Sequence, residues 1–255
     1  MTRRSARTVI TVASPTSATG RFRGIRRRLL RWFVSNRRAF FWREAAVAPF
    51  ALLVTEILLT KTRAELAAPV ATEVLKRFPT PAALARAEPR ALARTLYSLG
   101  LHEKRAEGLV SCARTLLDSH GGNVPDNAAA LERLPYVGRY AANAVASVAF
   151  GHRVGIVDSN VARVFGRVFA LPPPPKRLST AHAWWRLADS LVPRDHAKEF
   201  NWALLDLGSA VCTPRNPKCV SCPLATNCDY VRATVKPELP AKQVRIARKR
   251  SRRAT

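Results

Sequence analysis

The feature that most constrains this chain is a group of four cysteines near its C-terminal end. They are Cys212, Cys219, Cys222 and Cys228, spaced C-x6-C-x2-C-x5-C. Thiolates are soft ligands, and four in one short segment can converge on a zinc ion or on an iron–sulfur cluster. Zinc sites usually present two close pairs of cysteines, whereas only the middle two are closely spaced here. The spacing therefore favours a [4Fe–4S] cluster over zinc.

The overall charge indicates a polyanionic partner. The chain has 255 residues, of which 47% are hydrophobic, so it can form one large or two small domains with a proper core. It carries 43 Lys and Arg against 17 Asp and Glu, a net charge of +26. This imbalance disfavours an ordinary metabolic enzyme and favours a partner such as nucleic acid or an anionic membrane surface. Because no apolar run reaches the ~18 residues of a membrane span, we expect no membrane insertion.

The two ends of the chain carry much of this charge. Residues 1–38 contain eleven arginines and no acidic residue, and residues 236–255 contain eight Lys or Arg. We expect a basic, disordered arm over residues 1–21 and a basic tail over residues 233–255. The part between the ends remains basic, which still favours nucleic acid.

The pattern between the ends is helical. Apolar residues recur at helical spacing, none of the segments alternates with period two, and prolines separate them. Leu29 and Phe33 show this spacing near the start, and the apolar run from Phe50 to Leu59 predicts a helix that continues towards Ala67. Further helices are expected near residues 68–78, 89–98, 103–119, 127–134, 139–150, 159–169, 177–192 and 195–211. The chain is therefore predicted to be all-α.

Two local patterns in the middle of the chain carry chemistry. Residues 127–151 read as two helices joined by the bend Leu134-Pro135-Tyr136-Val137-Gly138. Such a hairpin can present backbone N–H groups to a phosphate, although an ordinary helical turn is an open alternative. Asp158 then precedes the next expected helix, where an aspartate is typical of an N-cap.

Together these motifs resemble the iron–sulfur helix-hairpin-helix DNA glycosylases, which include endonuclease III and MutY. The resemblance covers about residues 28–230. It implies a six-helix barrel domain over residues 49–153, which includes the hairpin, and a [4Fe–4S] cluster domain formed by residues 22–48 and 154–232. It also implies a DNA cleft between the two domains and a bound [4Fe–4S] cluster.

The residue at position 140 distinguishes branches of this family. Endonuclease III-type enzymes carry a lysine there that attacks C1′, whereas Tyr140 has no amine and forms no Schiff base. The resemblance therefore implies a monofunctional enzyme with weak or absent lyase activity. The segment from Thr55 to Thr62 is similar to the T-E-I-L-L-x-x-T helix of the thymine/uracil glycosylases that act on G:T mismatches. Tyr136 departs from the family pattern, which has glycine at that position of the bend, and a left-handed backbone there would strain it.

Two alternatives remain open. One is an adenine glycosylase of the MutY type without the domain that recognises oxidised guanine. The other is an iron–sulfur protein that binds DNA without catalysis. The presence of Asp158 and Glu56 argues against the second.

The resemblance assigns three catalytic residues. Asp158 would be the carboxylate that stabilises the developing sugar cation, kept ionised by hydrogen bonds at a helix end. Glu56 would hydrogen-bond or protonate the target base, and its place in an apolar helix supports a task because burying a carboxylate is costly. Tyr140 would pack against the flipped base.

The remaining roles concern DNA. Lys61 would wedge into the gap left by the flipped nucleotide, and Leu101 and His102 would form a second wedge. The other expected DNA contacts are Val137, Gly138, Arg139, Arg215 and Lys218. The partner is expected to be double-stranded DNA with a mismatched or damaged base, bound by a monomer in the cytoplasm and associated with the nucleoid.

Overall fold

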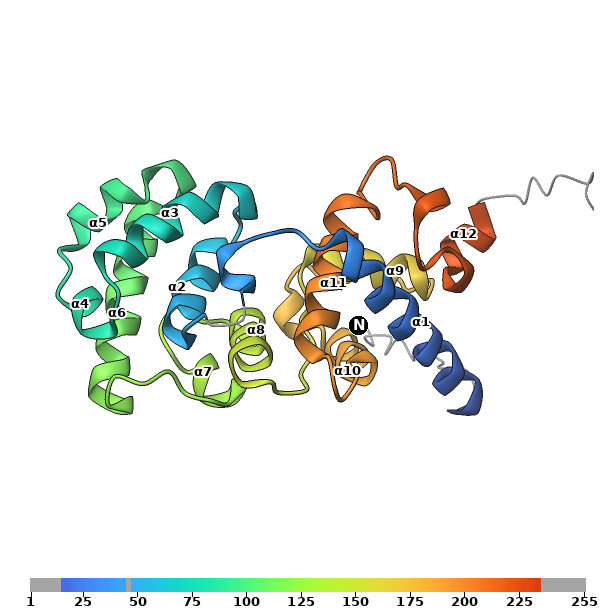
Figure 1. Ribbon diagram of the computed structural model, residues 1–255, viewed down its shortest axis with the longest axis horizontal. Helices are drawn as coiled ribbons and strands as arrows, with labels where there is room; N and C mark the ends of the chain where they lie inside the picture. Colours follow the sequence, from blue (N-terminus) through green and yellow to red (C-terminus); the bar gives the residue numbers. More distant parts are fainter. Residues whose placement is uncertain (1–14, 45–46, 235–255) are drawn as a thin grey trace, which may run out of the picture.

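The computed structural model describes residues 15–44 and 47–234 of the chain. Every regular element in these residues is an α-helix or a short 3-10 helix (Figure 1), which confirms the all-α prediction. Residues 1–14 and 235–255, which contain most of the expected arm and tail, lie outside the described residues.

One group of helices, towards the left in Figure 1, comes from residues 49–150. Its elements are α2 (Pro49–Leu59), α3 (Ala64–Arg77), α4 (Pro81–Ala85), α5 (Pro89–Thr95), η2 (Tyr97–Leu99), α6 (His102–His120), α7 (Ala128–Glu132) and α8 (Arg139–Phe150). Side-chain caps begin several of them: Thr80 accepts from the N–H of Ala83, and Asn127 accepts from the N–H of Ala130. Proline stands at the first position of α2, α4 and α5, where its missing N–H costs nothing.

The expected continuation of the helix from Phe50 towards Ala67 is wrong. α2 ends at Leu59 and α3 begins at Ala64. Between them Lys61 has a φ of 57°, in the left-handed region, which breaks the helical hydrogen-bond ladder. The apolar pattern continues across the break because both helices bury a face in the same core.

The other group of helices comes from both ends of the described chain. Its elements are α1 (Pro15–Asn36), α9 (Ser159–Val168), η3 (Leu178–Thr180), α10 (His182–Leu191), α11 (Ala197–Ala210), η4 (Cys219–Ser221), η5 (Ala225–Asn227) and α12 (Asp229–Thr234). α1 packs along α11, as Figure 1 shows at the right of the molecule. α1 includes residues 15–21, which were expected in the basic arm. At Arg21 the guanidinium donates to the carbonyl of Val168 and to the Asp229 carboxylate.

The two groups have separate hydrophobic cores. One core contains residues from Trp42 to Ala146, and the other joins Ile25, Leu29 and Phe33 to residues from Val157 to Cys228. Trp42, in η1 (Phe41–Arg43), belongs to the first core although residues 22–48 were expected in the cluster domain. Its indole is stacked on Phe40 with ring centroids 4.5 Å apart, which draws the connecting segment onto the first core.

The bend between α7 and α8 has the left-handed backbone at Tyr136 that the sequence analysis considered. Tyr136 has a φ of 63° and its side chain is half exposed. A tyrosine in this conformation costs roughly 1–2 kcal/mol relative to glycine. The ring packs over Gly108 of α6, where an added Cβ would lie 2.4 Å from the Tyr136 Cγ. The absence of a side chain at Gly108 therefore makes room for the tyrosine.

Candidate active site

A cleft of about 1160 Å³ lies where the two groups of helices face each other. Residues of both groups line it, including Glu56 of α2 and Tyr140 of α8 on one side and Asp158 and Asn160 of α9 on the other. All three predicted catalytic residues therefore meet in one cleft, although about 100 residues of sequence separate Glu56 from Asp158.

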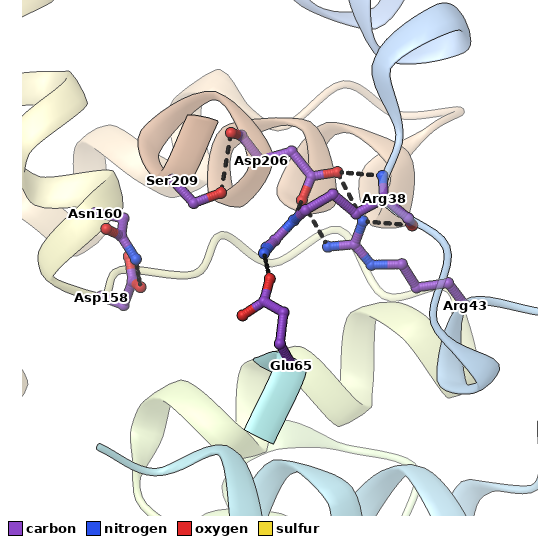
Figure 2. Close-up of polar contacts among 7 residues, drawn as sticks. All are labelled: Arg38, Arg43, Glu65, Asp158, Asn160, Asp206 and Ser209. Atoms are coloured by element: carbon purple, nitrogen blue, oxygen red, sulfur yellow. Dashed lines mark hydrogen bonds and ion pairs between the residues drawn. The ribbon is translucent and has the colours of Figure 1, made fainter. Parts of the chain in front are cut away.

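Asp158 is the N-cap of α9. Its Oδ1 accepts from the N–H of Val161 at 2.7 Å, and its Oδ2 accepts from the side chain of Asn160 at 2.8 Å (Figure 2). Burial raises the pKa of Asp158 above its ordinary value, while these hydrogen bonds and the charge of Arg163 oppose the rise. The N-cap is thus formed as expected, but the effect of burial on the pKa of Asp158 is larger than that of the cap hydrogen bonds.

Glu56 lies deeper than Asp158 and has fewer partners. It is 5% exposed, and its Oε2 is buried without a hydrogen-bond partner in the structure. Burial raises its pKa to about 8, with Arg43 opposing and the nearby Asp158 adding to the rise. Glu56 is therefore protonated at neutral pH. Two carboxyl groups in one cleft with different hydrogen bonding divide the roles of acid and anion between them.

Tyr140 lines the same cleft beside the two carboxyl groups. Burial raises its pKa well above the ordinary value, and the charges of Glu56 and Asp158 add to this. The side chain is thus a neutral phenol throughout the physiological range. It offers a flat face and a hydroxyl, and no nucleophilic amine.

An ion-pair network joins Asp206 of α11 to Arg38 and Arg43, two arginines that line the cleft (Figure 2). The side chain of Asp206, on α11, is 1% exposed. It accepts from Arg38 Nε at 2.7 Å and from Arg43 Nη1 and Nη2 at 2.7 and 3.0 Å. Arg38 also donates to the exposed Glu65 of α3. The network holds the segment between α1 and α2 against α11 and fixes the guanidinium of Arg43, whose charge opposes the rise in the pKa of Glu56.

A chain of hydrogen bonds connects Asp158 to the cysteine segment. Asn160 donates to Asp158 and accepts from Arg163 Nη2 at 2.8 Å. Arg163 Nε in turn donates to the carbonyl of Cys212 at 2.7 Å. The orientation of Asp158 therefore depends on the backbone around the first cysteine.

Three of the four predicted cysteine ligands pack on the second core: Cys228 is buried in it, and Cys212 and Cys222 lie against it. The fourth, Cys219, begins η4. Burial raises the pKa of the Cys222 thiol to about 11, and the other three cysteines add to this rise. Arg167 Nη1 donates to the Cys212 sulfur at 3.3 Å, the kind of hydrogen bond that tunes a cluster ligand. A donor set of four thiols in one short segment fits an iron–sulfur cluster. Within the described residues, no three Cys, His, Asp or Glu side chains are grouped closely enough for a single metal ion.

The two predicted wedges have unusual backbones. Lys61 and Leu101 have φ values of 57° and 51°, and both side chains are exposed. His102 begins α6, and its ring lies 5.0 Å from the ring of the exposed Tyr97. Strained residues that project from loops are typical of functional positions.

The predicted hairpin residues differ in exposure. Gly138 is exposed at the N-terminus of α8, and the guanidinium of Arg139 lies 4.4 Å above the ring of Trp185 at the cleft. The side chain of Val137 is buried in the first core, and its N–H donates to the carbonyl of Leu134. The role of these residues in DNA binding stays a prediction.

The basic residues of the cysteine segment are solvent-exposed. Arg215 and Lys218 both lie in the loop between Cys212 and Cys219, outside the cleft lining. Their exposure is compatible with the predicted contacts to phosphates, which stay a prediction.

The prediction from sequence missed several residues of the site. These are Arg38, Arg43, Asn160, Arg163, Trp185 and Asp206. A signal existed for Asp206, because it stands in the apolar run Ala203-Leu204-Leu205-Asp206-Leu207. The argument that indicated a task for Glu56 applies equally there.

Together, a neutral acid and a hydrogen-bonded carboxylate in a cleft with basic margins can cleave a bond that leaves a cation behind. Comparison with known proteins indicates the family to which such a site belongs. The model of the HhH-GPD superfamily of base excision DNA repair proteins matches residues 54–188, and that of the iron–sulfur binding domain of endonuclease III matches residues 212–228. The chain belongs to the HhH-GPD superfamily.

Relatives and solved structures agree. A thymine-DNA glycosylase of Aeropyrum pernix is 37% identical over 214 residues, which cover 83% of this chain and 96% of the relative. An adenine DNA glycosylase of Mycobacterium tuberculosis is 36% identical over 208 residues, covering 77% of this chain and 64% of the relative. The solved structure of a thermostable thymine-DNA glycosylase superposes with a TM-score of 0.78 at 30% identity, over 85% of this chain and 99% of that one.

The protein is therefore a DNA glycosylase of base excision repair, which hydrolyses the N-glycosidic bond, binds DNA and holds an iron–sulfur cluster. None of its described helices combines the length and the apolar character needed to cross a membrane.

Proposed function

We propose that this protein is a monofunctional glycosylase that removes thymine or uracil mispaired with guanine. The observation that carries the proposal is the meeting of Glu56, Tyr140 and Asp158 in one cleft. At the position where a lyase would need an amine, Tyr140 offers only a phenol. The names of the thymine/uracil-DNA glycosylases of Pyrobaculum aerophilum and Methanothermobacter thermautotrophicus, 40% and 34% identical to the chain, support the choice of base.

In the proposed reaction, exposed basic residues and the hairpin first bind duplex phosphates. A mispaired pyrimidine then flips into the cleft, because its weak pairing lowers the cost of extrusion. Lys61 and Leu101 fill the gap in the duplex. Tyr140 packs against the base.

The chemical step assigns different tasks to the two carboxyl groups. Protonated Glu56 donates a hydrogen bond to the departing base while the C1′–N bond breaks and its electron pair leaves with the base. Asp158, held by two hydrogen bonds, stabilises the positive charge that develops on the sugar. Water then adds to C1′ and gives its proton to Asp158. The product is an abasic site in an unbroken strand.

We propose that the cluster is [4Fe–4S], held by the four cysteines, and that it supports the loop of Arg215 and Lys218 beside the DNA. Analysis of the purified protein should give about four iron atoms and about four acid-labile sulfides per chain, and no zinc. The proposal further includes monomeric action in the cytoplasm at the nucleoid, the two domains with the limits expected from the sequence, and charged ends that strengthen association with DNA.

The test is base release from end-labelled duplexes with G:T, G:U, G:A or an oxidised pyrimidine, with and without hot alkali. We expect cleavage of G:T and G:U strands only after alkali, and no cleavage by Asp158→Asn. Strand breaks without alkali would overturn the monofunctional assignment. The first variant to examine would then be Lys61→Ala, because Lys61 is the single lysine among the described residues that line the cleft. Release from G:A alone would place the protein with the adenine glycosylases.

A further inference from the structure

Arg105 is a buried arginine with an unusual set of partners. It lies in the first turns of α6 and is 6% exposed. Its Nε donates to the carbonyl of Gly100 at 2.9 Å. Nη1 donates to the carbonyls of Ile57 and Leu58 at 3.2 and 2.9 Å. Nη2 donates to the carbonyl of Thr60 and the hydroxyl of Thr62, both at 2.7 Å. A guanidinium has five N–H groups, and each has an acceptor here.

Three of these acceptors, on Gly100, Thr60 and Thr62, belong to the two loops that carry the predicted wedges. The other two, on Ile57 and Leu58, lie in the last turn of α2, directly before the first loop. Thr60 and Thr62 flank Lys61, so the guanidinium holds the loop on both sides of that residue. Gly100 directly precedes Leu101. The carbonyl of Leu101 also accepts from the backbone N–H of Arg105, as the first bond of α6. One side chain therefore joins both loops.

Both wedge residues need this support, because each has a left-handed backbone. The φ values of Lys61 and Leu101 are 57° and 51°, and neither residue is glycine. A non-glycine residue in this region costs about 1 kcal/mol or more and persists only where its surroundings hold it. The hydrogen bonds from Arg105 to the carbonyls of Thr60 and Gly100 supply that hold at both positions.

The chemistry of the site requires arginine. All five acceptors are neutral oxygens, and in the described part of the chain no carboxylate pairs with Arg105. A buried charge without a counter-ion is costly unless hydrogen bonds solvate it fully. Lysine has three donors on one nitrogen and cannot span the acceptors of two loops as a planar fork does.

We propose that Arg105 is a positioning residue that sets the separation of Lys61 and Leu101, so that both enter the duplex together when the target nucleotide is extruded. This inference rests on the proposed function. Arg105 touches neither the base nor the sugar, and it acts only through the two loops.

The experiment compares base extrusion with base release in Arg105→Lys. Extrusion is read from the fluorescence of 2-aminopurine placed next to the target in a G:U duplex, and release from single-turnover rates at saturating protein. We expect the fluorescence gain of the variant to fall about tenfold and the release rate to fall with it, because at least two hydrogen bonds are lost. The pH dependence of the remaining release should keep its wild-type shape, since Glu56 and Asp158 are untouched.

Arg114→Lys is the matched control. Arg114 lies on the same helix, and its guanidinium donates to the carbonyl of Ala85, away from the wedges. It should leave both readouts within twofold of wild type. A wild-type fluorescence gain in Arg105→Lys, or a displaced pH profile, would overturn the proposal. Absence of base release by the wild-type protein would instead defeat the proposed function, while the fluorescence readout would still decide the role of Arg105.

A double-mutant cycle guards against a merely structural effect. If Arg105 acts through the wedges, Arg105→Lys should reduce extrusion much less in a Leu101→Ala background than in the wild type. Additive losses in the two variants would show that Arg105 acts elsewhere. Thermal unfolding of each variant establishes that the folded protein is being compared.

Discussion

At the scale of single residues, Glu56 shows how burial creates a usable acid. Its carboxyl has no hydrogen-bond donor at Oε2 and lies in an apolar helix, so the protonated form is favoured up to about pH 8. Asp158, a short distance away, accepts two hydrogen bonds that favour its anion. The same residue chemistry thus serves two purposes, because the two environments solvate charge differently.

The raised pKa of Glu56 predicts the pH dependence of both activity and stability. Base release should fall as pH rises through about 8, because Glu56 loses its proton, and this decline should be absent in Glu56→Gln. The unfolded chain releases this proton near pH 4.5, so the native state binds one extra proton between 4.5 and about 8. Its contribution to the free energy of unfolding is complete below 4.5 and is lost as pH rises to about 8, by roughly 1.4 kcal/mol per pKa unit.

Urea unfolding at pH 5 and pH 9 tests the stability part. Glutamine carries no titrating proton, so Glu56→Gln should gain stability relative to wild type at the higher pH. An equal difference at the two pH values would show that Glu56 titrates normally.

The contact between Tyr136 and Gly108 predicts that Gly108→Ala changes stability in opposite directions with and without the tyrosine ring. Gly108→Ala should destabilise the wild type by about 1–3 kcal/mol, because the new Cβ would lie 2.4 Å from the Tyr136 ring. In a Tyr136→Gly background the ring is gone, and the same change should stabilise the protein by roughly 0.5–1 kcal/mol, since alanine is the better helix former. Chemical denaturation of the four proteins measures this cycle. The same sign in both backgrounds would contradict the packing argument.

At the scale of elements, Asp206 decides how the segment between α1 and α2 reaches the cleft. Its buried carboxylate on α11 accepts hydrogen bonds from Arg38 and Arg43 (Figure 2). Arg43 in turn lies over the ring of Trp202, and its charge opposes the rise in the pKa of Glu56. The ion pair therefore connects the second core to the electrostatic environment of Glu56.

Asp206→Asn should cost about 3–5 kcal/mol of unfolding free energy, because it leaves two arginines without their buried counter-charge. Glu65→Gln is the control within the same network. Glu65 is 61% exposed in its pair with Arg38, so its loss should cost less than about 1 kcal/mol. Equal effects of the two changes in urea unfolding would show that the burial of Asp206 is not what matters.

Elements and motifs that depend on local sequence could be predicted, and those that depend on tertiary contact could not. The helices and the cap at Asp158 follow from spacing and residue type within a few turns. The cysteine spacing likewise indicated the iron–sulfur binding domain that the family model matches over residues 212–228. The break at Lys61 could not be predicted, because it is held by Arg105 from a distant helix. The place of Trp42 in the first core likewise depends on packing partners that no periodicity identifies.

At the scale of the whole molecule, the cleft lies where the two groups of helices, each with its own core, face each other. Positively charged side chains line this cleft. Basic side chains lie at its margin on both sides: Lys61 and Arg139 come from the first group of helices, and Arg163 comes from the second. The cysteine segment adds Arg215 and Lys218 outside the cleft. A duplex lying across the cleft would meet phosphate-binding groups of both groups of helices.

This arrangement predicts how DNA binding depends on salt. Each phosphate that a basic residue neutralises contributes about 0.9 to the slope of log K against log salt concentration. Arg215→Ala and Lys218→Ala should each reduce that slope by about one, because both side chains are exposed in the loop that the cysteines hold. The rate of base release at saturating protein should not change, since neither residue lines the cleft.

Arg90→Ala provides the comparison in this experiment. Arg90 is exposed on α5, at the far end of the first group of helices in Figure 1. Its replacement by alanine removes one positive charge, as Arg215→Ala and Lys218→Ala do. If the slope reports local phosphate contacts, Arg90→Ala should leave it unchanged, whereas an equal reduction would mean that only the net charge attracts DNA. Fluorescence anisotropy of a labelled G:U duplex across a salt series gives the slope for each variant and so separates the two cases.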